Sequence, residues 1–223
     1  MDSRLRIAGM TDGFTEYLLI PFGQKAKKAG YIMDNKKKAL KILRKKIIDE
    51  LFVDRWHDVW FFPNKDGVKG WQGTAPILFV GLNPSTGPGH FPSPADQIFY
   101  SCLAKNGFCN AHITDIYKIR ATGQKLPEIQ RNNCLLRLNR NYLLDEVNIL
   151  QPRLVVALGE ASHHMLRKWL SGINKEQLLR VPHYSWAYRW GKKARFSKEM
   201  NDVRKRYSDT TLPPLLRSDV EKM

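Results

Sequence analysis

Two uninterrupted apolar runs in the chain lack the alternation of a half-exposed strand. Residues 77–82 read Ile-Leu-Phe-Val-Gly-Leu, and residues 154–158 read Leu-Val-Val-Ala-Leu. Runs of this length without polar positions are typical of strands that are covered on both faces, as in a parallel sheet flanked by helices. We predict two further strands, at about residues 111–117 and 178–182.

Helical periodicity separates these runs. Apolar residues recur at helical spacing over residues 34–52, while Lys and Arg fill most of the remaining positions, so a basic amphipathic helix is expected there. Its cations either form a solvated face or contact DNA directly. Further helices are expected over residues 95–106, 127–150 and 161–171, and a short hairpin or loop over residues 56–73.

Strands that alternate with helices predict an α/β protein, a three-layer α/β/α sandwich with a mostly parallel central sheet of about four strands. We expect an N-terminal extension over residues 1–70, packed on the main domain and carrying the basic helix. The α/β domain is expected over residues 71–196, and a basic C-terminal tail over residues 197–223.

Polar or special residues follow each predicted strand. They are Asn83, Asp115, the pair Gly159-Glu160, and His183. Ligands of parallel sheets bind at the carboxyl ends of the strands, so these positions predict a site. Asn83 could hold a water there, and His183 could donate to an oxygen on which charge develops. Taken singly, His183 also suits a turn and Asp115 a cap.

The charge balance changes the range of expected partners. Lys and Arg number 37 against 21 Asp and Glu, giving a net charge of +16, which suits binding to a polyanion such as DNA. Aromatic and cationic residues also interleave over residues 183–195, as in surfaces that stack on bases. The same sequence pattern would also occur in a basic loop that covers a hydrophobic cluster.

The cysteines and the apolar runs argue for an intracellular protein. Three cysteines without a C-x-x-C spacing predict reduced thiols, and no zinc site or iron–sulfur cluster. The N-terminal residues lack the core of a signal peptide, and no apolar run is long enough to span a membrane. No phosphate-binding loop of the G-x-x-x-x-G-K-[ST] type and no G-x-S-x-G motif is present.

Four segments together resemble the uracil-DNA glycosylase superfamily over about residues 75–190. Gly81-Leu-Asn-Pro84 resembles the first catalytic motif of its mismatch-specific and single-strand-selective branches. His112-Ile-Thr-Asp-Ile-Tyr-Lys-Ile-Arg120 is similar to its second strand. Gln151-Pro-Arg-Leu-Val-Val-Ala-Leu-Gly-Glu-Ala161 is similar to its Pro-containing segment. Val181-Pro-His-Tyr-Ser185 stands in the place of the second catalytic motif.

The resemblance implies a monofunctional DNA glycosylase of base-excision repair. It would hydrolyse the N-glycosidic bond of uracil, or of another deaminated or mispaired base, flipped out of single- or double-stranded DNA. Asn83 would position the attacking water, and His183 would stabilise the departing base anion. No metal or organic cofactor is implied, and the enzyme would be a monomer that binds DNA and no membrane.

The resemblance also implies two sets of binding residues. Phe91 or Phe99 would stack on the flipped base, and Trp186 or Tyr188 would fill the space that it leaves. The base would be bound by Gly81, Leu82, Pro84, Phe91, Phe99 and Asp115. The DNA would be contacted by Ser85, Thr86, Lys118, Arg120, Ser185, Trp186, Tyr188, Arg189, Lys192 and Lys193.

Two positions depart from the family pattern. Tyr184 stands where the second motif usually has Pro, and Asp115 stands where many relatives have Asn. An amide both donates and accepts hydrogen bonds, whereas an ionised carboxylate only accepts. Two other functions stay open from the sequence: a non-catalytic nucleic-acid-binding protein on this fold, and an α/β enzyme acting on free nucleotides or nucleosides.

Overall fold

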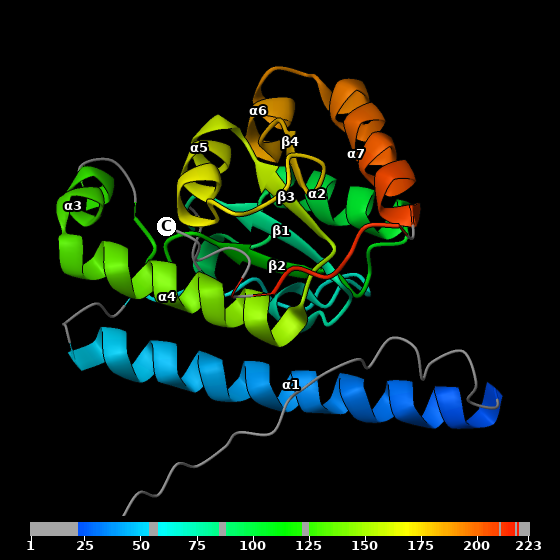
Figure 1. The fold of residues 1–223 in the computed structure, drawn as a ribbon. Coiled ribbons are helices and arrows are strands. Elements are labelled where there is room, and N and C mark those ends of the chain that lie inside the picture. The colour runs from blue at the N-terminus through cyan, green and yellow to red at the C-terminus, as the bar shows by residue number, and fades with distance from the viewer. Residues whose placement is uncertain are drawn as a thin grey trace, which may run out of the picture. The chain divides into compact units, whose positions relative to one another are not determined.

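The computed structural model describes residues 22–53, 58–84, 88–121, 125–209, 211–216 and 218 (Figure 1). Contacts between Cα atoms group residues 36–223 into one compact unit and residues 1–35 into another. Helix α1 (Phe22–Val53) passes from one unit into the other. The fold described below is that of the unit beginning at Lys36.

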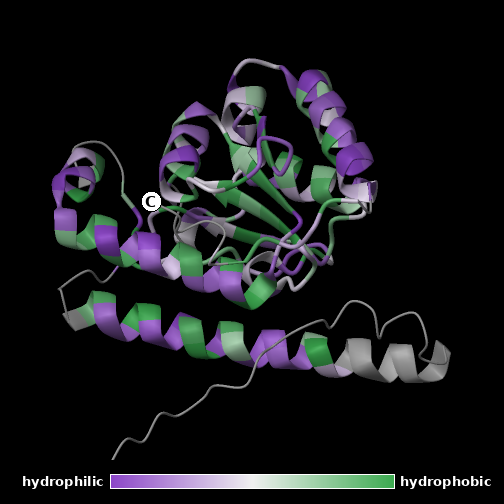
Figure 2. Cartoon of the chain, viewed as in Figure 1, coloured by the Kyte–Doolittle hydropathy of each residue, from purple (hydrophilic) through white to green (hydrophobic). Residues whose placement is uncertain are grey.

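The centre of this unit is a sheet of four parallel strands in the order β2-β1-β3-β4. Its strands are β1 (Ile77–Gly81), β2 (His112–Asp115), β3 (Leu154–Leu158) and β4 (Leu178–Val181). Strands β1, β2 and β3 are buried at every position, which explains why their sequences do not alternate. The strands are mostly green, the colour of apolar residues, in Figure 2.

Helices cover both faces of the sheet, which confirms the predicted α/β sandwich. Helices α4 and α5 lie on one face and α2, α6 and α7 on the other (Figure 1). The helices are α2 (Pro94–Lys105), α3 (Lys125–Arg131), α4 (Asn133–Leu150), α5 (Glu160–Trp169), α6 (Tyr184–Arg189) and α7 (Lys193–Ser208), with short 3-10 turns η2 (Gly70–Gln72) and η3 (Pro88–His90).

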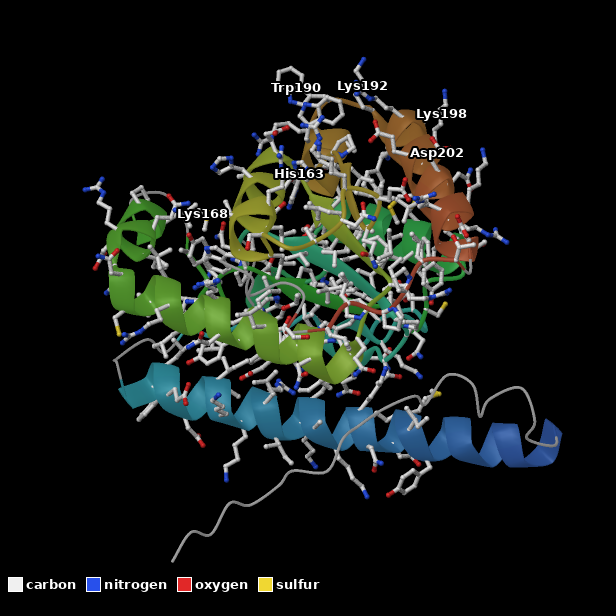
Figure 3. The ribbon with its side chains drawn as sticks, viewed as in Figure 1. His163, Lys168, Trp190, Lys192, Lys198 and Asp202 are labelled. Carbon is white, nitrogen blue, oxygen red and sulfur yellow. The ribbon has the colours of Figure 1, made fainter. Side chains whose placement is uncertain are left out.

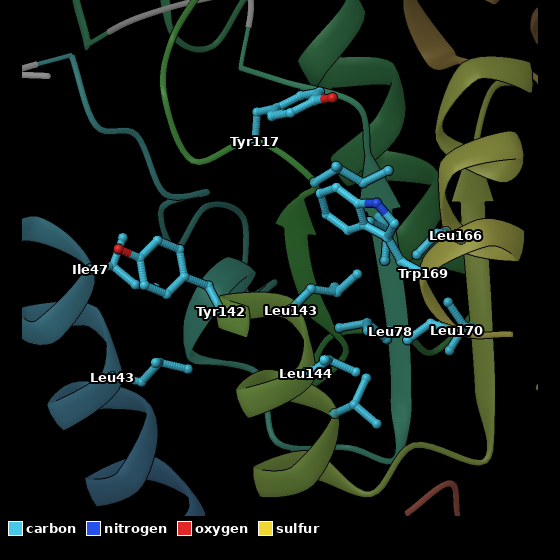
Figure 4. Packing of buried hydrophobic residues seen from close by; sticks show 14 of the residues in the cluster. Leu43, Ile47, Leu78, Tyr117, Tyr142, Leu143, Leu144, Leu166, Trp169 and Leu170 are labelled. Atoms are coloured by element: carbon cyan, nitrogen blue, oxygen red, sulfur yellow. The ribbon is translucent and has the colours of Figure 1, made fainter. Parts of the chain in front are cut away.

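Successive residues of β1 supply two separate hydrophobic clusters. Leu78 and Val80 pack with α4 and α5, whereas Ile77 and Phe79 pack with α2 and α7. This division follows from the pleat, because neighbouring side chains of a strand point to opposite faces. Figure 4 shows the first cluster, with Leu78 beside Leu143 and Leu144 of α4.

The part of α1 after Lys36 packs on α4. Leu43 and Ile47 of α1 face Tyr142 of α4 in Figure 4, and both belong to the buried cluster. The Tyr142 hydroxyl donates to Glu50 Oε2 at 2.8 Å, and Lys46 Nζ lies 3.1 Å from Asp145 Oδ2. The helix begins at Phe22, earlier than the expected residue 34.

One expected helix is two helices. The pattern over residues 127–150 predicts a continuous element, but α3 ends at Arg131 and α4 begins at Asn133. Asn132 between them has an extended ψ of 102°, and its side chain accepts hydrogen bonds from Cys134 N and Leu135 N. Asn is a strong N-cap residue, so it starts a new helix here.

The expected tail begins inside a helix. Residue 197 falls within α7, where Phe196, Met200 and Val203 are all buried in the cluster beneath α2. Leu212 belongs to the same cluster, and Leu215 belongs to the cluster on the opposite face of the sheet. The C-terminal segment therefore packs on the α/β domain at least as far as Leu215. The expected boundary of an N-terminal extension at residue 70 stays a prediction.

The segment before β1 contains the tight turn that its sequence predicts. Lys65 and Val68 form an antiparallel bridge. Between them, Asp66 and Gly67 have positive φ values of 51° and 80°, as a two-residue hairpin turn requires. Among the described helices, none is long and apolar enough to cross a membrane.

Truncating the contact between α1 and α4 should destabilise the whole domain. Ile47 is fully buried, whereas Ile42 on the same helix is 72% exposed. Ile47→Ala should lower the free energy of unfolding by about 2–5 kcal/mol, because it leaves a cavity in the core. Ile42→Ala should change it by less than about 0.5 kcal/mol. Urea denaturation measures both, and equal effects would show that α1 does not pack as described.

Candidate active site

The register of the sheet brings the predicted site residues to one edge. Gly81 at the end of β1 pairs with Asp115 at the end of β2, and Leu158 of β3 pairs with Val181 of β4. Asn83 and His183 follow β1 and β4 within two residues. These strands are separated by β3 alone, so their ends lie about 10 Å apart at ~4.8 Å per strand.

The side chain of Asn83 is held in one orientation. Its Nδ2 donates to the carbonyl oxygen of Ala121 at 2.7 Å and to that of Pro84 at 3.2 Å. Carbonyl oxygens only accept, so these contacts identify the nitrogen end of the amide and occupy its two protons. The Oδ1 atom is consequently the end that Asn83 offers to a ligand, and it is an acceptor.

The loops that follow β1 and β2 are tied together at this point. Ile116 N donates to Gly81 O, and Tyr117 N donates to Leu82 O, both at 2.9 Å. Ala121 N donates to Pro84 O at 3.2 Å. Leu82 is half-buried and Pro84 is buried, so of the two only Leu82 offers side-chain surface at the strand end. The predicted DNA contacts Ser85 and Thr86 lie outside the described residues.

Asp115 lies directly against the backbone of Gly81. A Cβ atom added to Gly81 would stand only 2.1 Å from Asp115 Oδ1, so only glycine fits beside this carboxyl group. Burial raises the pKa of the Asp115 carboxyl to about 7; nearby Lys118 opposes the rise, while Glu146 and Asp96 add to it. At neutral pH about half of these groups carry a proton, and a protonated carboxyl both donates and accepts, as an amide does.

Lys118 is buried inside the domain. It is 1% exposed, and its ammonium group lies 2.6 Å from Glu146 Oε1 and 2.6 Å from Thr114 Oγ1. Burial works against the charge of Glu146, but Lys118 beside it holds the pKa of that carboxyl below its ordinary value. Lys118 also donates to the Asp115 carbonyl oxygen. The predicted phosphate contact is therefore wrong, because this lysine stabilises the β2 end from inside.

His183 caps α6 and is neutral. Its Nδ1 accepts from Ser185 N at 3.2 Å and lies 2.7 Å from Ser185 Oγ. A backbone N–H only donates, so Nδ1 is the unprotonated nitrogen and Nε2 carries the proton. Burial lowers the pKa of His183 to about 4, although Asp96 opposes this shift. Nε2 is thus a neutral hydrogen-bond donor at physiological pH.

Tyr184 fixes the plane of His183. The Tyr184 ring lies between two others: Phe99 stacks on it at 4.6 Å with an interplanar angle of 4°, and His183 at 4.4 Å with 25°. Burial raises the pKa of Tyr184 well above its ordinary value, and the nearby Asp96 carboxyl group adds to the rise. The tyrosine that replaces the usual proline therefore supports the histidine by packing, where proline would restrict the backbone.

Of the two rings predicted to stack on a base, Phe91 is partly exposed and Phe99 is not. Phe99 is fully buried and Tyr184 covers its ring, so the predicted contact of Phe99 with a base is wrong. Phe91 is half-buried beside α2. Its ring lies 5.6 Å from that of Tyr100 and 5.8 Å from that of Trp60.

The predicted DNA contacts on α6 and in the turn after it are exposed. Tyr188 is 46% exposed and Trp190 is 64% exposed. Trp190 and Lys192 project outward at the top of Figure 3. Trp186 is half-buried under the guanidinium group of Arg195, 5.7 Å away, so Tyr188 suits the wedge better. The remaining exposed cations are Arg189 and Lys193, and half-exposed Arg120 pairs with Asp58 at 3.5 Å.

Sequence reasoning missed Asp96. Its place after Ser93 marks it as part of a capping box, and it does accept from Ser93 N at 2.9 Å. After burial, Asp96 is the next cause of the raised pKa of Tyr184. Tyr184 is remote in sequence, so no local signal predicts that Asp96 lies near it. Among the described residues, no group of three or more His, Cys, Asp or Glu could hold a metal ion.

A known protein family matches the part of the chain that contains these residues. The model of a family described as the uracil DNA glycosylase superfamily matches residues 70–206. That range covers more than half of the chain and contains all four parallel strands. No curated protein matches the chain.

The raised pKa of Asp115 should make stability depend on pH. In the unfolded chain this carboxyl ionises near pH 4, but in the fold it holds its proton to about 7. The stability that the Asp115 carboxyl contributes to the fold is therefore fully present below about pH 4 and is lost as the pH rises to 7. The free energy of unfolding of Asp115→Asn, relative to that of the wild type, should therefore increase by about 2–4 kcal/mol when the pH is raised from 4 to 8. Urea denaturation at both pH values measures this, and a constant difference would contradict the assignment.

Proposed function

The chain belongs to the uracil-DNA glycosylase superfamily, and from that premise we propose that it is a monofunctional glycosylase of base-excision repair. It would hydrolyse the N-glycosidic bond of uracil, or of another deaminated or mispaired base, in DNA. The target base would have to leave the helix, because the scissile bond is out of reach within the stack. The enzyme would act as a monomer in the cell compartment that holds the DNA.

The fixed orientation of the Asn83 amide carries this proposal. Both Nδ2 protons are donated to carbonyl oxygens, so Oδ1 would accept a hydrogen bond from water. That water would attack C1′ of the deoxyribose as the bond from C1′ to the base breaks. The bonding electron pair would leave with the base, and the water would lose a proton to solvent. Asn83 would thus contribute orientation rather than base strength.

The neutral His183 supports the second half of the reaction. The departing base carries negative charge, delocalised onto a carbonyl oxygen of its ring. The Nε2–H of His183 would donate to that oxygen, and its strength as a donor grows as the charge develops. A neutral imidazole suits this task because Ser185 holds its other nitrogen as an acceptor. Tyr184 and Asp96 would be positioning residues, since they act through the His183 ring.

The remaining strand-end residues would recognise the base. Phe91 would stack on its face, and the close contact of Asp115 with Gly81 would put a carboxyl group at its edge. In its protonated form, Asp115 would donate to a base carbonyl and accept from a ring N–H, which reproduces the pattern of an amide. Tyr188 would occupy the space that the base vacates.

Removing the side chain of either Asn83 or His183 should slow excision at least about 100-fold while leaving DNA binding intact. Oligonucleotides bearing uracil, thymine opposite guanine, hypoxanthine or xanthine would be incubated in single- and double-stranded form, then cleaved with alkali at abasic sites. Asn83→Ala should slow the single-turnover rate by about 10²–10⁴-fold, and His183→Ala by about 10²–10³-fold. The exposed residues Asn201 and His164 give the matched controls Asn201→Ala and His164→Ala.

The same experiment separates the competing functions. Tight, salt-dependent binding by the wild type without cleavage of any substrate would indicate a non-catalytic nucleic-acid-binding protein. Hydrolysis of free nucleosides without duplex binding would indicate an enzyme of nucleotide metabolism. Duplex binding is recognised by its salt dependence, because it relies on phosphate contacts. Excision by Asn83→Ala at the wild-type rate would refute the proposed role of Asn83.

Excision of uracil should weaken as Asp115 loses its proton. The pKa of this group is raised to about 7, so the donor form prevails below that pH and disappears above it. The single-turnover rate should fall by about tenfold per pH unit well above 7 if only the protonated form binds the base productively. Asp115→Asn should remove this fall. A wild-type rate that rises above pH 7 would instead indicate that the carboxylate activates the water.

A further inference from the structure

Two adjoining hollows lie between α1 and the segment that precedes β1. The first has a volume of about 470 Å³ and the second about 430 Å³. Both are lined by Arg44 of α1 and by Asn64, Trp71 and Gln72 of the segment. Because they share these residues, the two hollows lie side by side, and we call them together the α1 groove.

The first hollow of the α1 groove is cationic. Lys37, Lys41 and Arg44 contribute from successive turns of α1, and Lys69 from the opposite wall. Among the described residues that line it there is no carboxylate. Cations that surround a concave, low-dielectric surface repel one another and concentrate their field within it, so they favour an anionic occupant. A chain of phosphates satisfies several of them together.

The second hollow of the α1 groove is aromatic and leads toward the candidate active site. Its lining includes Trp60, which is half-buried, together with Val59 and Pro63. The Trp60 ring lies 5.8 Å from that of Phe91, the residue proposed to stack on a flipped base. The groove therefore runs from the cations of α1 to an aromatic surface beside Phe91.

The wall shared by the two hollows is ordered by packing. The Arg44 guanidinium group lies over the ring of Phe61 at 5.0 Å, and Phe61 packs edge-on against Trp71 at 4.6 Å. Phe61 and Trp71 are buried in the same cluster as Leu40 and Ile47 of α1. A preorganised cation loses less conformational entropy on binding than a freely rotating one, and this argues against a merely solvated face.

We infer that the α1 groove binds a single-stranded segment of DNA that flanks the target base. Phosphates would lie along Lys41 and Lys69, and a base would stack on Trp60, as in proteins that grip single strands. From Lys37 to Ile48 the groove follows α1 for about 16 Å at ~1.5 Å per residue. That length accommodates a few nucleotides of a single strand. The inference rests on the proposed function, because the flank is defined by the base that is excised.

Binding of a fluorescent single-stranded oligonucleotide tests the α1 groove directly. The variant pair Lys41→Glu/Lys69→Glu reverses cations that line the groove. The control pair Lys38→Glu/Lys45→Glu reverses exposed lysines of α1 that are not among its lining residues. The net charge changes equally in both pairs, so a difference in affinity reports position rather than long-range attraction. Thermal unfolding checks that each pair is folded, and Lys41→Gln/Lys69→Gln replaces the first pair if it is not.

The groove pair should bind the single strand at least about tenfold more weakly than the control pair. Its plot of log affinity against log salt should also be shallower by about 1.4, because about 0.7 is lost for each phosphate contact of a single strand. Trp60→Ala should weaken binding by about tenfold. Equal affinities and slopes for the two pairs, or a loss confined to fully duplex DNA, would overturn the inference.

A second measurement separates failure of the groove from failure of the proposed function. Substrates would carry a single-stranded flank on only the 5′ or only the 3′ side of the target base. The wild type should excise one of them about tenfold faster at limiting enzyme, since one groove serves one side, and the groove pair should lose that preference. At saturating enzyme, the groove pair should excise the base at the same rate as the control pair. Excision without any preference would refute the groove alone, whereas no excision with retained groove binding would refute the glycosylase.

Discussion

The parallel register of the four strands is the constraint on which the rest of this structure depends. Because β1 to β4 all run the same way, one edge of the sheet collects every polar strand end. Hydrogen bonds from Ile116 and Tyr117 to the β1 end then join two of those loops. The site residues are consequently held by buried strands rather than by flexible loops, which suits a reaction that depends on orientation.

The fold follows from local sequence, whereas parts of the site do not. Uninterrupted apolar runs predict β1 and β3, and the ends of the four predicted strands place Asn83, Asp115 and His183 at one edge. The apolar periodicity does not predict the break between α3 and α4, because a single capping residue, Asn132, starts a new helix within an otherwise continuous pattern. The periodicity does not predict the burial of Lys118 either, since its partner Glu146 comes from a helix that packs only in the folded chain.

The departures from the family pattern have a common physical basis in stacking and burial. Tyr184 lacks the backbone restriction of proline, but its ring stacks on both Phe99 and His183. Asp115 lacks the amide of its relatives, but burial raises its pKa to about 7. Stacking thus constrains Tyr184 in place of a proline ring, and burial gives Asp115 a proton to donate, as an amide has. A comparison of motifs alone does not reveal either effect.

Burial also explains how a strongly basic protein maintains uncharged groups at its proposed site. A net charge of +16 would by itself favour ionised carboxyls and neutral imidazoles through simple Coulomb interactions. At Asp115 desolvation outweighs that field, and at His183 it acts with it. The exposed cations Arg189, Lys192 and Lys193 lie on α6, in the turn after it and at the start of α7. Under the proposed function they would attract phosphates without ionising the buried carboxyl. Affinity for DNA would then reside at the surface, and the electrostatics of bond cleavage at the strand ends.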